Sequence, residues 1–181
     1  MRNQWLYIVF ILTSIMITSC GNPPREPNRQ GKNQKREKAL EQALIDANKR
    51  AIAEEEHMIQ KYIQRHKWEM HRVSSGLYYG IYHNGEGRKV RTGSTVSMEY
   101  TIELLNGYQC YSSKARGKPK TFTVGKGDAE TGLHRIMPYL QEGDKAKVII
   151  PSFLAYGIAG DKKEIPPKAT LVYDIHIIKV N

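Results

Sequence analysis

The chain has 181 residues, 40% of them hydrophobic, and a formal net charge of +10. This length fits one domain of ordinary size with an appendage. An excess of positive charge can indicate a nucleic-acid partner, but here the charges are mixed: residues 20–72 hold 12 basic and 8 acidic side chains, and residues 73–181 hold 15 and 10. Such mixing is typical of a solvated surface, and we expect no nucleic-acid partner.

Residues 1–19 have the pattern of a secretory signal, with Arg2 before an apolar stretch that runs from Trp5 to Ile17. The stretch is too short to span about 30 Å of hydrocarbon as a helix. The sequence Ile17-Thr18-Ser19-Cys20 resembles a bacterial lipobox. This resemblance implies cleavage before Cys20, a diacylglyceryl group on its sulfur and further acylation by a fatty acid such as palmitate. Several acyl chains anchor a protein stably to a membrane.

The residue after Cys20 is Gly21, and no Asp stands there to retain a lipoprotein in the inner membrane. By resemblance to that sorting pattern, we expect the chain in the cell envelope, lipid-anchored in the outer membrane and facing the periplasm. An ordinary signal peptide is the alternative. If Cys20 carries lipid, Cys110 has no partner within the chain, so no disulfide is predicted.

Residues 20–33 are rich in Pro, Gly and Asn and predict a disordered tether. Residues 34–72 lack both Pro and Gly, and their apolar residues recur at helical spacing from Leu40 to Ile63. This predicts a helical stalk that either docks as a spacer on its own domain or pairs with a second copy as a homodimer. Its three histidines are five or nine residues apart, which does not fit a metal pair on one helix face.

Residues 73–181 predict a single α+β domain. Residues 95–104 alternate apolar and polar side chains, as in a half-buried antiparallel strand, and Asn106-Gly107 predicts a hairpin turn. Shorter strands are expected at 120–124 and 145–150, a long final strand at 170–180, and one short helix at 131–139. The expected fold is an antiparallel sheet wrapped around that short helix, preceded by the long N-terminal helix.

Four segments of this domain resemble the FKBP family of peptidyl-prolyl isomerases. They are 96–101 with Tyr111-Ser112-Ser113 after the hairpin, 122–127, 155–157 (Ala-Tyr-Gly), and 165–174 (Ile-Pro-Pro-Lys-Ala-Thr-Leu-Val-Tyr-Asp). The resemblance covers residues 76–181. The whole layout is similar to FKBP-type lipoproteins of Bacteroidetes, among them gliding-motility-associated members.

The resemblance implies a peptidyl-prolyl cis-trans isomerase that acts on proline-containing envelope proteins and needs no metal or cofactor. Tyr156 is expected to donate its hydroxyl to a substrate carbonyl, and the backbone N–H of Ile165 is the second expected donor. Cys110 and Tyr111 border the pocket. The aromatic cup would consist of Tyr100, Phe122, Leu133, Ile165 and Tyr173, where Phe122 reads equally well as core or as pocket wall.

The chain departs from the family pattern at the edge of this pocket. Cys110-Tyr111 replaces a Phe-Asp pair, Lys120 replaces a Phe, Ala129-Glu130 replaces a Val-Ile pair, and Glu164 replaces an apolar residue. These changes predict a reshaped and less apolar cup, and they leave catalytic efficiency and macrolide binding open. The alternative function is an FKBP-fold chaperone or binding module with weak or no turnover.

Overall fold

The computed structural model describes residues 29–127 and 129–181, with side chains from residue 33 onward. The expected signal peptide at 1–19, Cys20 and the first part of the expected tether lie outside the described residues. The chain divides into two compact units, with the boundary between Asp46 and Ala47.

The N-terminal helix α2 extends over Arg29–His66. It begins inside the segment expected to be a disordered tether, because no proline follows Pro27 to interrupt it. It also ends six residues before the expected end at Arg72. Lys67 adopts a left-handed conformation (φ 55°), and the Trp68 N–H donates to the Ile63 carbonyl at 3.2 Å, which is a Schellman-type helix end. Among the described residues, no helix is both long and apolar enough to cross a membrane.

The globular part contains a seven-stranded antiparallel sheet in the order β1-β2-β6-β7-β3-β4, with β5 paired to β3. The long strand expected at 95–104 is confirmed with the same bounds, and β1 lies within the segment expected to be stalk. The strands are β1 (His71–Arg72), β2 (Tyr78–His83), β3 (Thr95–Leu104), β4 (Gln109–Ser112), β5 (Lys120–Thr123), β6 (Lys145–Ile150) and β7 (Leu171–Val180).

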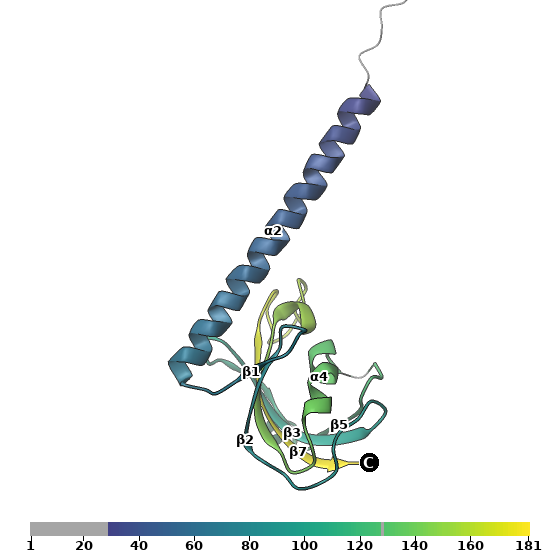
Figure 1. Cartoon of the computed structure of the whole chain (residues 1–181). Coiled ribbons are helices and arrows are strands. Elements are labelled where there is room, and N and C mark those ends of the chain that lie inside the picture. The colour runs from purple at the N-terminus through teal and green to yellow at the C-terminus, as the bar shows by residue number, and fades with distance from the viewer. Residues whose placement is uncertain (1–28, 128) are drawn as a thin grey trace, which may run out of the picture. The chain divides into compact units, whose positions relative to one another are not determined.

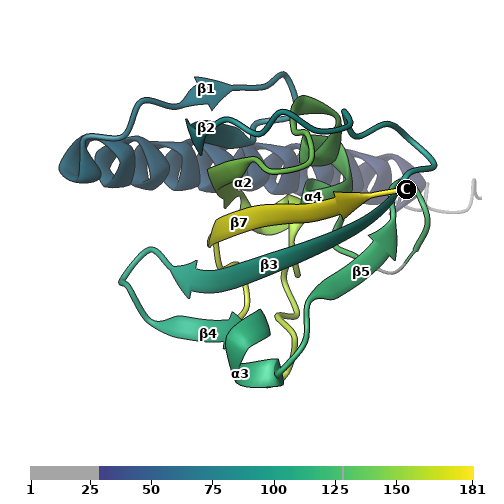
Figure 2. The ribbon, with the colours of Figure 1, turned by 90° about the horizontal axis from the view of Figure 1, so that it is seen from below.

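One face of the sheet curves around the short helix α4 (Thr131–Ile136), as Figure 1 shows. A 3₁₀ turn (Met137–Tyr139) continues this helix, so the helix expected at 131–139 is confirmed as two shorter pieces. Leu133 and Ile136 are fully buried against the inward-facing residues of β3, β6 and β7. Two further short elements are α3 (Ser113–Arg116) and a 3₁₀ turn (Ser152–Leu154). Figure 2 shows β7, β3 and β5 side by side, with α3 after the end of β4.

The opposite face of the sheet is covered at one end by the last turns of α2. Ile59 and Tyr62 of this helix form a second buried cluster with Tyr78, Ile149 and Val172. Ile149 and Val172 alternate along β6 and β7 with residues of the first core, so they point to the other face. The helix from Ala47 to His66 therefore packs on its own domain.

Candidate active site

The structure brings the eight residues expected at the site to one region of the core. The five expected cup side chains are at most 6% exposed and belong to a single cluster. The other three, Tyr156, Tyr111 and Cys110, are partly buried and pack against the same cluster. The cup side chains come from β3 (Tyr100), β5 (Phe122), α4 (Leu133), the segment before β7 (Ile165) and β7 (Tyr173).

Two aromatic contacts order the interior of this cluster. The rings of Tyr100 and Tyr173 lie 6.4 Å apart with an interplanar angle of 43°. The ring of Phe122 meets His134 edge to face at 5.4 Å, a favourable arrangement for two π systems. The buried hydroxyl of Tyr173 has no hydrogen-bond partner among the described residues. Burial and the nearby charge of Glu130 raise the pKa of this hydroxyl, so it stays protonated.

A charged group lies beside Tyr156. The Tyr156 hydroxyl donates to Glu130 Oε1 at 2.5 Å, and Lys120 Nζ lies 3.2 Å from Glu130 Oε2. The Glu130 side chain is only 7% exposed. Burial alone would raise the pKa of Glu130, but the charge of Lys120 and the hydrogen bond from Tyr156 hold this pKa below its ordinary value. An ionised carboxylate therefore lies beside Tyr156, next to the expected cup.

The same environment keeps Tyr156 protonated. Burial, followed by the hydrogen bond to Glu130, raises the pKa of the Tyr156 hydroxyl well above its ordinary value. The hydroxyl is thus a hydrogen-bond donor throughout the physiological pH range. The sequence flagged Lys120 and Glu130 as separate departures from the family pattern. Their pairing was missed, because nothing in the nine residues between them indicates that the two side chains meet.

The second donor expected at the site, the Ile165 N–H, is hydrogen-bonded to Asp161. The backbone N–H of Ile165 donates to Asp161 Oδ1 at 2.9 Å, and the carboxylate also accepts from the Lys163 N–H at 2.8 Å and from the Tyr111 hydroxyl. Slight burial would raise the pKa of Asp161, and these three donors hold it below its ordinary value. Sequence reasoning did not assign Asp161 a role, and the Ile165 N–H is not free in this structure.

Cys110 behaves as a small apolar residue. Its thiol lies 3.6 Å from the Glu164 carbonyl oxygen. Burial and the charges of Asp161 and Glu164 raise its pKa, so the thiol form dominates and the residue is a poor nucleophile.

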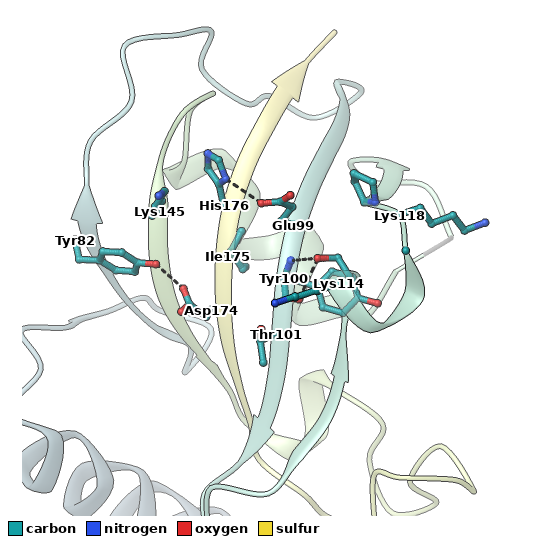
Figure 3. Close-up of a pocket in the computed structure, with 13 residues that line it drawn as sticks. Tyr82, Glu99, Tyr100, Thr101, Lys114, Lys118, Lys145, Asp174, Ile175 and His176 are labelled. Atoms are coloured by element: carbon teal, nitrogen blue, oxygen red, sulfur yellow. Dashed lines mark hydrogen bonds and ion pairs between the residues drawn. The ribbon is translucent and has the colours of Figure 1, made fainter.

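The hollow drawn in Figure 3 is lined by outward-facing residues of the sheet, such as Glu99 and Asp174, and also by Tyr100 of the expected cup. It has a volume of about 450 Å³. Along β3, Glu99 alternates with the inward-facing residues, and it pairs with His176 at 3.3 Å. Tyr82 donates to Asp174 at 2.7 Å, and burial and this hydrogen bond raise the pKa of Tyr82 to about 12. Within residues 29–127 and 129–181, no group of three His, Cys, Asp or Glu side chains is arranged to hold a metal ion.

Comparison with known proteins identifies the family. Residues 86–178 match the FKBP-type peptidyl-prolyl cis-trans isomerase family. FK506-binding protein 1 of Debaryomyces hansenii is 39% identical over 102 residues, which are 56% of this chain and 91% of that protein. The FKBP-type peptidyl-prolyl cis-trans isomerase FkpA of Buchnera aphidicola is 34% identical over 153 residues, which are 81% of this chain and 58% of that protein.

The solved structure of FkpA from Escherichia coli has the same fold. It superposes with a TM-score of 0.62 at 24% identity, over 99% of this chain and 82% of that one. The chain belongs to the FKBP-type peptidyl-prolyl cis-trans isomerase family, and its activity is peptidyl-prolyl isomerisation.

Proposed function

We propose that this isomerase twists X–Pro bonds in the cup formed by Tyr100, Phe122, Leu133, Ile165 and Tyr173, with Tyr156 as the donor to the substrate. The observation that carries the proposal is the Tyr156 hydroxyl, which stays protonated and sits against the edge of the buried cluster. No nucleophile is needed, because the reaction rotates a bond and breaks none.

The chemistry follows from the nature of the amide bond. Rotation about X–Pro passes over a barrier of about 18–20 kcal/mol, since it disrupts amide resonance. A twisted amide is less polar than a planar one, so an apolar cup favours the transition state over the ground state. A donor to the carbonyl of the substrate holds the peptide in place during this rotation.

Substrate binding has to compete with two carboxylates. The Tyr156 hydroxyl is engaged by Glu130 in the free protein, and the Ile165 N–H is engaged by Asp161. We propose that the substrate carbonyl displaces Glu130 from Tyr156. Ile165 contributes its side chain to the cup, and its N–H serves as a second donor when Asp161 releases it. Cys110 and Tyr111 border the peptide next to this position.

We further propose that the protein works at the cell envelope on proline-containing polypeptides exported there. The support is the lipobox-like sequence ending at Cys20 after the signal-like residues 1–19. Acyl chains on Cys20 would hold the chain at the outer membrane on its periplasmic side. Expression of the wild type and of Cys20→Ser with radiolabelled palmitate tests this. Label on the wild type and none on the variant supports lipidation, and an unlabelled wild type contradicts it.

The stalk supports a proposal on oligomeric state as well. Residues 47–66 pack on the domain of their own chain, whereas Leu40 and Leu44 are 62% and 58% exposed. These leucines are four residues apart and share one helix face. We propose that the helix before Asp46 pairs with a second copy.

A prolyl-isomerisation assay of the full-length chain tests the catalytic proposal, with peptides that vary the residue before proline. Tyr156→Phe is expected to lower kcat/KM by about tenfold, in line with the loss of a buried hydrogen bond. Tyr82→Phe is the matched control, since it also removes a hydroxyl bonded to a carboxylate, but on the outer face of the sheet. Equal activity of all three proteins would contradict the role of Tyr156. Absence of any acceleration by a folded wild type would indicate a binding module on the FKBP scaffold.

A further inference from the structure

Glu55 is a buried carboxylate that the catalytic proposal does not use. It belongs to the part of α2 that packs on the domain, and it is 8% exposed. Three donors reach it: the Ser152 N–H at 2.6 Å, the Ser152 hydroxyl at 3.0 Å and the Thr170 hydroxyl at 2.6 Å. Burial of a carboxylate is costly unless its oxygens are hydrogen-bonded, and here both of them are.

The two residues that Glu55 contacts lie at the two ends of one segment. Ser152 follows β6 and Thr170 precedes β7. The chain between them, residues 152–170, carries both Tyr156 and Ile165. A single side chain on the N-terminal helix therefore fixes the beginning and the end of the segment that supplies two of the expected catalytic residues.

Hydrogen bonds continue from this contact to Tyr156. The Ser152 carbonyl accepts from the N–H of Gly157 at 2.8 Å, next to Tyr156 in sequence. The Gly157 carbonyl in turn accepts from the Lys168 N–H at 2.7 Å, which joins the two halves of the segment. Glu55 thus accepts from the N–H of Ser152, and the carbonyl of the same residue accepts from Gly157, the residue after Tyr156.

We propose that Glu55 is a positioning residue for catalysis, which sets the place of the Tyr156 hydroxyl relative to the cup through Ser152 and Thr170. This inference rests on the proposed role of Tyr156. It gives the last turns of α2 a part in the reaction as well as in stability. Misplacement of a catalytic group by about 1 Å can cost two orders of magnitude in rate, so a contact of this kind has a measurable effect.

The test uses the full-length chain and four changes. Glu55→Ala removes the carboxylate, and Glu55→Gln keeps its size, one acceptor oxygen and an N–H₂ group that can donate to the Ser152 hydroxyl. Thr170→Val removes one of the three donors at nearly constant volume. Glu54→Ala is the matched control, because Glu54 is the exposed neighbour of Glu55 on the same helix. Each change is made in the wild type and in Tyr156→Phe.

We expect Glu55→Ala to lower kcat/KM by about tenfold in the wild type and by less than about threefold in Tyr156→Phe, because the two residues act on one step. Glu55→Gln and Thr170→Val should lie between Glu55→Ala and the wild type, and Glu54→Ala should be neutral. Amide hydrogen exchange should accelerate in residues 152–170 before it accelerates in β3 or β7.

Two results would overturn the inference: the same fold-loss from Glu55→Ala in both backgrounds, or faster exchange spread evenly over the sheet. If Glu55→Ala does not fold, the same two measurements on Glu55→Gln and Thr170→Val test the inference. If the proposed role of Tyr156 is wrong, Tyr156→Phe will have the same kcat/KM as the wild type. The hydrogen-exchange measurement will still show whether Glu55 stabilises residues 152–170, so the two failures can be told apart.

Discussion

The hydroxyl of Tyr156 donates to the carboxylate of Glu130 at 2.5 Å, and this carboxylate is also paired with Lys120. Most hydrogen bonds to an ionised acceptor are stronger than those to a neutral carbonyl. The free protein therefore offers Tyr156 a better acceptor than the peptide carbonyl that would replace it. Substrate affinity should therefore respond to the charge at position 130.

Glu130→Gln should strengthen substrate binding. The amide oxygen accepts a weaker, neutral hydrogen bond from Tyr156, so the substrate carbonyl displaces it more easily. We expect KM to fall by about fivefold, which corresponds to about 1 kcal/mol, and kcat to change little. Steady-state isomerisation kinetics measure both constants.

The same substitution in Tyr156→Phe is the control for this prediction. Without the hydroxyl there is no competition to relieve, so Glu130→Gln should leave KM of that variant unchanged. An equal drop of KM in both backgrounds would mean that the charge acts on the substrate directly and not through Tyr156.

Stability at acidic pH should depend on Glu130. Burial would raise the pKa of this carboxyl, but Lys120 and Tyr156 hold it below the ordinary value of 4.5. A carboxyl group with a depressed pKa in the folded state stabilises the fold above its unfolded pKa, and this contribution is lost as the pH falls through the folded pKa. The Tm of the wild type minus that of Glu130→Gln should therefore be constant near pH 7 and decrease below about pH 4.5.

Thermal unfolding between pH 3 and pH 7 (a range set by the ordinary carboxyl pKa values) measures this difference. Glu54→Gln removes an exposed carboxylate from α2 and should show no comparable trend. A Tm difference for Glu130→Gln that does not change with pH would contradict the depressed pKa.

Gly132 should be required for the contact between α4 and β6. A Cβ at this position would lie 2.3 Å from Ile150 Cγ2 and 3.1 Å from the Leu154 carbonyl oxygen. Gly132→Ala forces these groups apart. Because this overpacking outweighs the better helix propensity of alanine, we expect the free energy of unfolding to fall by about 1–2 kcal/mol. Chemical denaturation measures the loss. Gly127→Ala is the matched control, since no atom lies within 4 Å of its Cβ, and an equal effect of both changes would refute the packing argument.

Much of the fold was predictable because its signals are local. The alternation in β3 follows directly from one buried and one exposed face. In β6 and β7 it holds only in part, because Ile149 and Val172 are buried on the other face against α2. The helix boundaries were less predictable. The start of α2 at Arg29 depends on weak competition between helix and coil in a polar segment, and its end at His66 depends on the conformation of Lys67.

The candidate site was predictable only in part, because only some of its contacts have local signals in the sequence. The aromatic residues of the cup are found by resemblance of short motifs, and the structure gathers them in one cluster. The contacts of Glu130 with Lys120, and of Glu55 with Thr170, join segments separated by 10 and 115 residues. Nothing local distinguishes these charged residues from the exposed ones around them, so such pairs become visible only once the chain is folded.

The exposed leucines of α2 should mediate self-association. Leu40 and Leu44 are 62% and 58% exposed, and they are four residues apart on one face of the helix. If this face pairs with a second copy, sedimentation equilibrium of the full-length chain should show a dimer. Leu44→Glu should then raise the dimer dissociation constant by tenfold or more, because it places a charge in an apolar contact at a cost above about 1.4 kcal/mol.

Gln42→Glu introduces the same residue on the other side of the helix and should leave the dimer intact. The isomerase activity of Leu44→Glu should equal that of the wild type, since Leu44 lies outside the unit that contains the cup. A chain that is monomeric at all accessible concentrations would contradict pairing through this face. The helix before Asp46 would then be a spacer between the membrane anchor expected at Cys20 and the catalytic domain, and its length would set the reach of that domain from the membrane.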